Sequence, residues 1–147
     1  MSALDTTAGG NAIIALLEGI PSIAHVQWGV PESTSPRLSA YVTVGSAAPE
    51  RKTSATVVRW TRYMVLLAYR VDNNEQNAEQ ALAAAVEGIQ AAIQNDLTLG
   101  SVAADAEIDL GLADDPQYRM TAGREYREYP IIIALKQYGS YNIEPGG

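Results

Sequence analysis

The sequence has no cysteine, no phenylalanine and a single histidine, His25, among its 147 residues. Without cysteine, the chain forms no disulfide and holds no metal through thiolates. A chain of this length buries about 70% of its unfolded surface, so a hydrophobic core can form without either cross-link. We therefore expect one domain over residues 1–147, with a Gly/Pro-rich tail at residues 139–147 that is mobile in the free protein.

Positive charge and long apolar runs are also scarce. Ten Lys/Arg stand against seventeen Asp/Glu, which gives a net charge of −7. An acidic protein repels nucleic acid at long range, so sequence-specific DNA or RNA binding is not expected. The strongest apolar runs, residues 64–69 and 130–135, are too short to span a bilayer, and the first residues carry no secretory signal. No membrane partner is expected.

Motifs of enzyme chemistry are missing from the sequence. It contains no G-x-S-x-G, HExxH or Walker loop. His25 lies between Ala24 and Val26 without a nucleophile or an orienting partner nearby in sequence, so a structural role is favoured. Gly9-Gly10 lacks the Lys-Ser/Thr of a phosphate loop and is interpreted as the lead-in to a helix. We expect no catalytic residue and no cofactor.

Two acidic groupings invite a metal interpretation. Residues 72–83 begin with the ligand spacing of an EF-hand loop but lack its glycine and its final glutamate, so helix capping is favoured. Asp105, Glu107 and Asp109 share one face of an expected strand and could ligate a hard cation, although a solvated or interface face is favoured. The sequence therefore predicts no metal site.

Periodicity in the first half predicts one helix and two strands. The helix begins at Thr6 or Thr7 and ends at Gly19 and Pro21. A short extended piece at residues 25–31 follows. Alternation predicts a strand at residues 38–44, a polar loop at 45–56 and a strand at 57–71. The last strand is apolar on both faces at its centre, so we expect it to be central and covered on both sides.

The second half predicts a long helix at residues 75–94, capped from residues 72–74. Its apolar stripe consists of Ala78, Leu82, Ala85, Val86, Ile89 and Ile93. The stretch "NDLTLGS" should end it: Asn95 and Asp96 stop the helix, Leu97 and Leu99 fold onto the core, and Gly100 permits a tight turn.

Two further strands are expected after this helix, at residues 106–112 and 124–138, with a loop at 113–123 between them. Pro130 should mark a bulge or an edge in the second strand. The expected fold class is α+β, a mainly antiparallel or mixed sheet with one long helix across a face and a short N-terminal helix.

The basic and aromatic residues form two groups. Arg59, Trp60, Arg62 and Tyr63, with Arg51 and Lys52 in the preceding loop, make the main basic neighbourhood, where an acidic partner could dock or where the loop is simply solvated. In "REYREY" the glutamates cancel the local positive charge, which disfavours single-strand nucleic-acid binding. The candidate interaction surface is Arg51, Lys52, Arg59, Arg62, Arg124, Tyr126, Arg127 and Glu128.

One long segment suggests a family. "YRVDNNEQNAEQALAAAVEGIQAAIQNDLTLGS" resembles the strand, acidic turn, helix and L-x-L-G stop of tail terminator (tail completion) proteins of long-tailed bacteriophages. The early "G-x-P", the polar stretch between the first two strands and "DDPQYRMTAGREY" before an apolar last strand agree with that pattern. The resemblance covers most of residues 12–138, within a core of residues 8–138. The proline in the last strand and the tail after residue 139 depart from the pattern.

The resemblance implies a structural virion protein without enzymatic activity. Such proteins form hexameric rings that cap the head-proximal end of the tail tube, stop its polymerisation and present a surface to the neck of the head. The implied partners are further copies of the chain, the tail tube protein and a head-completion or neck protein, with DNA only passing through the lumen. Assembly would occur in the host cytoplasm. Two alternatives stay open: another neck or connector protein, and a small-ligand-binding or enzymatic α+β domain, which would need a pocket of convergent polar groups.

Overall fold

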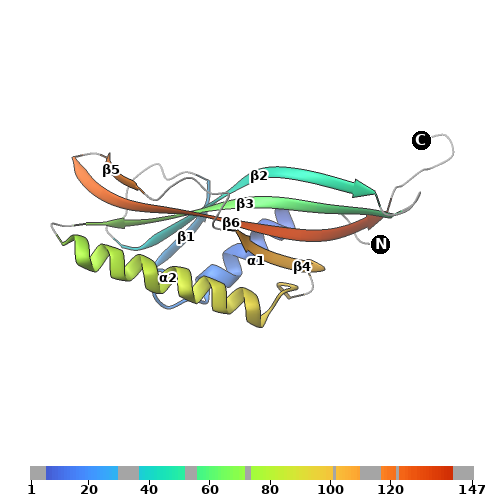
Figure 1. Cartoon of the computed structure of the whole chain (residues 1–147), viewed down its shortest axis with the longest axis horizontal. Helices are drawn as coiled ribbons and strands as arrows, with labels where there is room; N and C mark the ends of the chain where they lie inside the picture. The colour runs from blue at the N-terminus through green and yellow to red at the C-terminus, as the bar shows by residue number, and fades with distance from the viewer. Residues whose placement is uncertain are drawn as a thin grey trace.

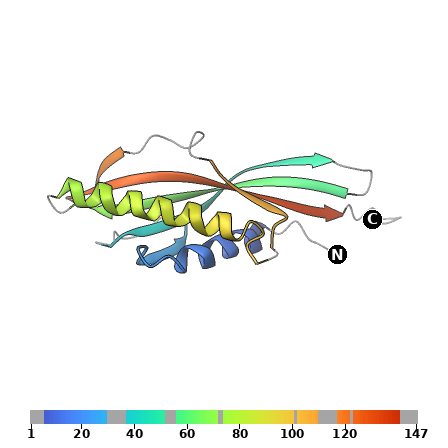
Figure 2. The same cartoon turned by 60° about the horizontal axis from the view of Figure 1, so that its bottom comes forward.

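A sheet with both helices on one of its faces makes up the computed structural model (Figures 1 and 2). The structure describes residues 6–29, 37–51, 56–71, 74–100, 102–109, 117–121 and 123–140, with only the main chain at residues 46–51, 56–57, 117, 121 and 139–140. The elements are α1 (Thr6–Glu18), β1 (His25–Trp28), β2 (Ser39–Arg51), β3 (Thr56–Arg70), α2 (Glu75–Asn95), β4 (Asp105–Asp109), β5 (Gln117–Thr121) and β6 (Arg124–Ser140).

The sheet has the strand order β1-β2-β3-β6-β4, and β5 also pairs with β6. Only β1 and β2 are parallel, while the other pairs are antiparallel. Six strands in a mixed sheet with two helices give the expected α+β class. The long strands β2, β3 and β6 continue beyond the end of α2, so one end of the sheet projects past that helix (Figure 1).

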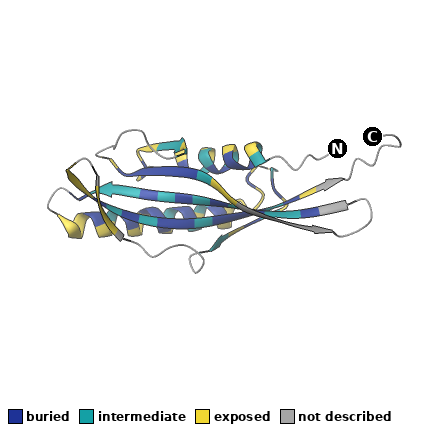
Figure 3. Cartoon of the chain, turned by 90° about the horizontal axis from the view of Figure 1, so that it is seen from above, coloured by how far each residue is buried: buried dark blue, intermediate teal, exposed yellow. Residues whose placement is uncertain are grey.

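Strand β3 is central, but its two faces differ. Tyr63, Val65 and Leu67 are fully buried and belong to the core between the sheet and the helices. The intervening Met64 and Leu66 are half-buried, and Figure 3 shows this alternation along the strand. The expectation that β3 is covered on both sides is wrong in that both helices pack on the same face of the sheet. We call the opposite side the open face.

Helix α1 approaches the sheet closely because it has two glycines at its start. A Cβ on Gly9 would lie 2.4 Å from Oη of the buried Tyr63, and one on Gly10 would lie 1.8 Å from the Trp28 ring. Tyr63 donates a hydrogen bond of 2.7 Å to the Thr6 carbonyl oxygen, and Trp28 donates one of 2.9 Å to Asn11. The glycines are thus packing positions within the helix, not a lead-in to it.

Helix α2 confirms its predicted stripe residue by residue. All six apolar positions of the stripe are buried, and the Asn74 side chain caps the helix by accepting from the Asn77 amide at 3.0 Å. At the other end the Asp96 carboxylate accepts from the Gly100 amide at 3.0 Å. Leu99 is buried with a positive φ of 47°, as part of the predicted stop. Leu97, however, is 46% exposed, so only one of the two leucines folds onto the core.

Several predicted loops are strands. Residues 45–51, expected in a polar loop, belong to β2, and only residues 52–55 of that loop lie outside the described residues. The reason is pairing with β3, which continues to Arg51 after a register shift between Val44 and Ala47. Strand β5 forms within the loop expected at residues 113–123 because β6 offers it an edge. Strand β4 begins one residue before the prediction, and residues 110–112 are outside the described part.

Strand β6 extends to Ser140 and so includes the first two residues of the predicted mobile tail. Residues 141–147 lie outside the described part of the chain. Pro130 pairs with Leu66 in a β3–β6 register that has no shift, so it causes no bulge there. The β5 pairing reaches Glu128 and the β4 pairing starts at Ile132, so Pro130 lies between the two on the other side of β6. No described residue pairs with Pro130 on that side, where a proline could not donate an amide.

Among the described residues, neither helix is both long enough and apolar enough to cross a membrane.

Candidate interaction surface

The alternation of strand β3 separates the predicted basic neighbourhood. Arg59 shares the helix-covered side with Tyr63, which is a core residue and not a surface one, whereas Arg62 shares the open face with Met64. Successive side chains of a strand point to opposite faces, so residues three apart cannot form one patch. Arg51 lies in β2 with only its main chain described, and Lys52 is outside the described residues. Of the four predicted cations, the structure therefore places only the side chains of Arg59 and Arg62, and these are on opposite faces.

The side chain of Arg59, which belongs to β3, reaches the start of α1. Its Nη2 donates to Thr6 Oγ1 at 2.9 Å and to Gln137 Oε1 at 3.4 Å, while its Nε is buried without a partner. Gln137, only 3% exposed, donates onward to the Val102 carbonyl at 3.3 Å. Arg59 therefore joins α1 to the sheet, and this use makes it a poor residue for recognising an external partner.

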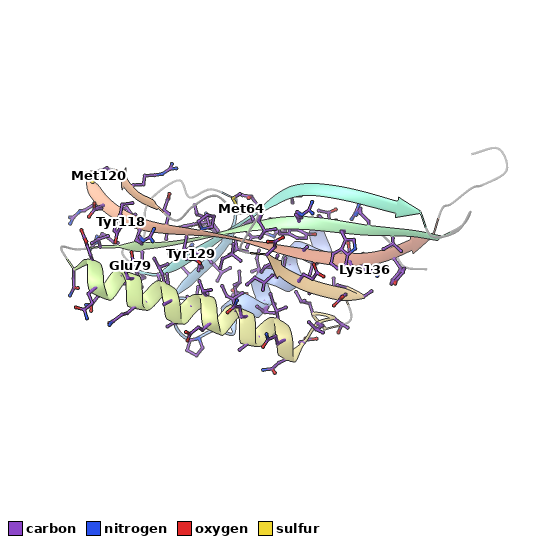
Figure 4. The ribbon with its side chains drawn as sticks, in the orientation of Figure 1. Met64, Glu79, Tyr118, Met120, Tyr129 and Lys136 are labelled. Atoms are coloured by element: carbon purple, nitrogen blue, oxygen red, sulfur yellow. The ribbon has the colours of Figure 1, made fainter. Side chains whose placement is uncertain are left out.

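On the open face a lysine lies between two aromatic rings. Lys136 Nζ is 5.8 Å from the centre of the Trp60 ring and 5.5 Å from that of Tyr138. Lys136, labelled in Figure 4, is opposite Trp60 in the β3–β6 pairing. Tyr138 is 39% exposed. Lys136 is not among the residues predicted for the interaction surface, although it is the only cation in residues 128–147 and the alternation of β6 places it on the open face.

The "REYREY" residues mainly contact other residues of the same chain. Arg127 Nε pairs with Glu79 Oε1 at 2.5 Å, and the Tyr118 hydroxyl donates to the same oxygen at 2.7 Å. The Arg127 guanidinium also lies over the Tyr118 ring, 4.9 Å from its centre. Glu79 and Tyr118 face each other between α2 and β5 in Figure 4. This three-residue cluster, which we call the hairpin clamp, fixes the β5–β6 hairpin to α2.

The hairpin clamp perturbs two protonation equilibria. Hydrogen bonds from Arg127 first and from Tyr118 second lower the pKa of the Glu79 carboxyl below its usual value. The hydrogen bond to the ionised Glu79 raises the pKa of the Tyr118 phenol, because deprotonation would remove the donor and place two negative charges together.

The remaining candidates of the hairpin differ in exposure. Glu128 is nearly buried and pairs with Arg119 at 3.0 Å, and Tyr126 is only 5% exposed. Arg124 is exposed at the β5–β6 turn. Met120 of β5, opposite Glu125 and labelled in Figure 4, is 65% exposed. Arg124 is thus the one predicted hairpin residue with an exposed side chain.

Of the two acidic groupings considered for a metal ion, the first begins at Asp72, which lies outside the described residues. Among the described residues, no three His, Asp or Glu side chains are arranged to hold an ion. Asp105, Glu107 and Asp109 share the open face of β4, opposite Lys136, Ala134 and Ile132 of β6. His25 is exposed and within 2.8 Å of the Gln27 side chain. Its expected structural role finds no support in burial.

Comparison with known protein families gives no match for this chain, and comparison with curated proteins finds no similar sequence. The case for a function therefore depends on the sequence pattern and on the surfaces described above.

Proposed function

We propose that this chain is a structural virion protein that forms a ring at the head-proximal end of a phage tail tube, ends tube polymerisation and joins the tail to the neck of the head. The observation that carries the proposal is the segment in which the family resemblance is concentrated. That segment, residues 69–101, contains the end of β3, the Asn74 cap, α2, and a stop formed by Asp96, Leu99 and Gly100.

The role of the L-x-L-G stop supports a structural function. Asp96 holds the turn through Gly100, and Leu99 is buried in the same core as the α2 stripe. This segment contains no reactive group, and its side chains close the helix against the sheet. A protein that works by capping needs complementary surfaces rather than a nucleophile, and a closed ring needs two different surfaces that meet after a fixed rotation.

The proposed partners are other copies of this chain in a hexameric ring, the last ring of tail tube protein, and a head-completion or neck protein. One side of the ring would match the tube, and the other would refuse further tube subunits. The chain is proposed to act in the virion after assembly in the host cytoplasm, with DNA passing through the lumen without sequence-specific contacts.

A complementation titration tests this function. Tails assembled without the protein should overgrow or fail to join heads. Purified protein should restore joined particles in proportion to the amount added, until a fixed ratio of protein to tails is reached, because the action is stoichiometric. Electron microscopy measures tail length and joining. Normal-length, head-joined tails in its absence would refute the proposal, and normal-length tails that stay unjoined would favour a neck or connector protein instead.

A further inference from the structure

We propose that copies of this chain join by sheet extension: β4 of one copy pairs, antiparallel, with the free edge of β2 in the next copy. The inference deepens the proposed ring and rests on it for its biological meaning. The contact itself can be tested on the purified protein alone.

In the described part of the chain, two strand edges without a neighbour lie at opposite sides of the sheet. Strand β1 pairs only with residues 39–42 of β2, so from Thr43 to Arg51 the single neighbour of β2 among the described strands is β3. At the other side, β4 pairs with β6, and no further described strand pairs with β4. A strand edge presents a row of amide and carbonyl groups that can bind another strand.

The two edges are level with each other along the strands. Glu107 of β4 lies opposite Ala134 of β6, which lies opposite Arg62 of β3. Arg62 in turn falls at the register shift of β2 between Val44 and Ala47. Two copies placed side by side in the same orientation therefore bring β4 of one next to the free part of β2 in the other, without sliding.

Strand direction also suits this contact. Three antiparallel pairings separate β2 from β4, so the two strands run in opposite directions. When β4 of a neighbour is added to β2 in a continued sheet, the new pair is antiparallel. Antiparallel pairs have the more favourable hydrogen-bond geometry.

The charges select this pairing over others. Three of the five β4 residues are acidic and none is basic, so two β4 edges repel each other. Arg62, level with the free part of β2, lies on the same open face as these carboxylates. Pairing of β4 with β2 therefore brings acidic side chains toward a cation, whereas pairing of two β4 edges does not.

Both edges carry features that oppose unrelated strands. The β2 edge has the register shift and Pro49, and the Ala106 amide of β4 donates to the Asp105 carboxylate at 2.9 Å. Shifts, prolines and charges on an edge are ways in which proteins avoid indiscriminate pairing. Pro49 also limits the length available on β2 to about the length of β4. The contact joins two different surfaces, so its repetition closes into a ring when the rotation between copies allows it.

Hydrogen exchange at low and high protein concentration tests the pairing directly. Light scattering defines the assembled state as masses that are multiples of 15.7 kDa. We expect outward-facing amides of β4 and of residues 43–48 to exchange at least about tenfold more slowly in the assembly. Amides of β3, paired on both sides within the chain, serve as the internal reference. A protein that stays monomeric, or assembles with unchanged exchange at both edges, overturns the proposal.

Charge exchange provides the second test. Glu107→Lys or Arg62→Glu alone should place like charges at the contact and weaken assembly by about tenfold or more at low salt, and mixing the two variants should restore it. Glu18→Lys, an exposed change of the same charge on α1, is the matched control and should assemble like the wild type. Wild-type assembly by both single variants, or no recovery in the mixture, refutes the contact.

This result is separable from the proposed function. If copies assemble edge to edge but phage tails form normally without the protein, the tail function is refuted and the contact stands. If the protein terminates tails while neither strand edge becomes protected from exchange, the contact is refuted and the function stands.

Discussion

Gly9→Ala should destabilise the protein, although the same change in an ordinary helix is stabilising. Alanine is favoured over glycine inside a helix by about 0.5–1 kcal/mol. Here the new Cβ would lie 2.4 Å from Tyr63 Oη, and Tyr63 is fully buried and hydrogen-bonded to the Thr6 carbonyl oxygen. Because Tyr63 is fully buried, relief of this contact should either lift α1 from the sheet or break the buried hydrogen bond.

The magnitude follows from these two costs. Overpacking a well-packed core costs about 1–3 kcal/mol, and a buried polar group left without its partner costs about the same. After subtraction of the helix propensity gain, we expect a loss of about 2 kcal/mol in the free energy of unfolding. Urea denaturation followed by circular dichroism measures it as a lower midpoint with an unchanged slope, at a protein concentration that is held constant.

A double variant makes the reasoning specific. In Tyr63→Phe the Oη atom is gone, and the nearest atoms to an alanine Cβ at position 9 would be at 3.2 Å. The penalty of Gly9→Ala should therefore become small in the Tyr63→Phe background. Gly88→Ala in α2, whose Cβ would meet only an Ile20 methyl at 3.2 Å, is the control and should be nearly neutral. An unchanged or higher stability of Gly9→Ala in the wild-type background would refute the close approach.

Three further outcomes are expected. Ile89→Asp should place an unpaired charge in the core and cost several kcal/mol, on the order of the whole stability of a domain, so an unchanged thermal melt would mean that α2 packs through another face. Replacing Arg51 and Lys52 with Glu should leave the melt intact and weaken assembly, most strongly at low salt, and equal ring formation would count against this end of the sheet as an interaction site. Glu79→Gln should destabilise the protein at neutral pH through the loss of the Arg127 pair. The lowered folded pKa of Glu79 means that this stabilisation is present above the unfolded value near 4.5 and disappears as the pH falls through the folded value, so chemical denaturation should show the two proteins converging in acid.

Local signals determined which parts of the fold could be predicted. Helix α2 followed from its 3.6-residue stripe and its capping residues, because both are written within one segment. The ends of β2 and the existence of β5 could not be predicted in the same way, since they depend on pairing with β3 and β6, which are distant in sequence. The polar composition of residues 45–51 predicts a loop, but pairing with β3 makes this segment part of strand β2.

The candidate surface shows the same limit. Arg59 and Arg62 could have been assigned to opposite faces from the two-residue period of β3 alone. The contact of Arg59 with Thr6 could not have been predicted in this way, because it depends on where α1 begins in space. Arg127 and Tyr118 likewise meet Glu79 only because the hairpin folds over the start of α2.

Strand β6 has a consequence for synthesis on the ribosome. It is the last described element, yet it pairs with β3, β4 and β5, and the sheet is incomplete until residue 140 has left the exit tunnel. Earlier segments can emerge in order, but β4 and β5 have no described partner before β6 arrives. Completion of this sheet therefore waits for β6, and its pace is set by contacts between distant segments. The β4 edge that is proposed to meet β2 of another copy can therefore form only once β6 is available to pair with it.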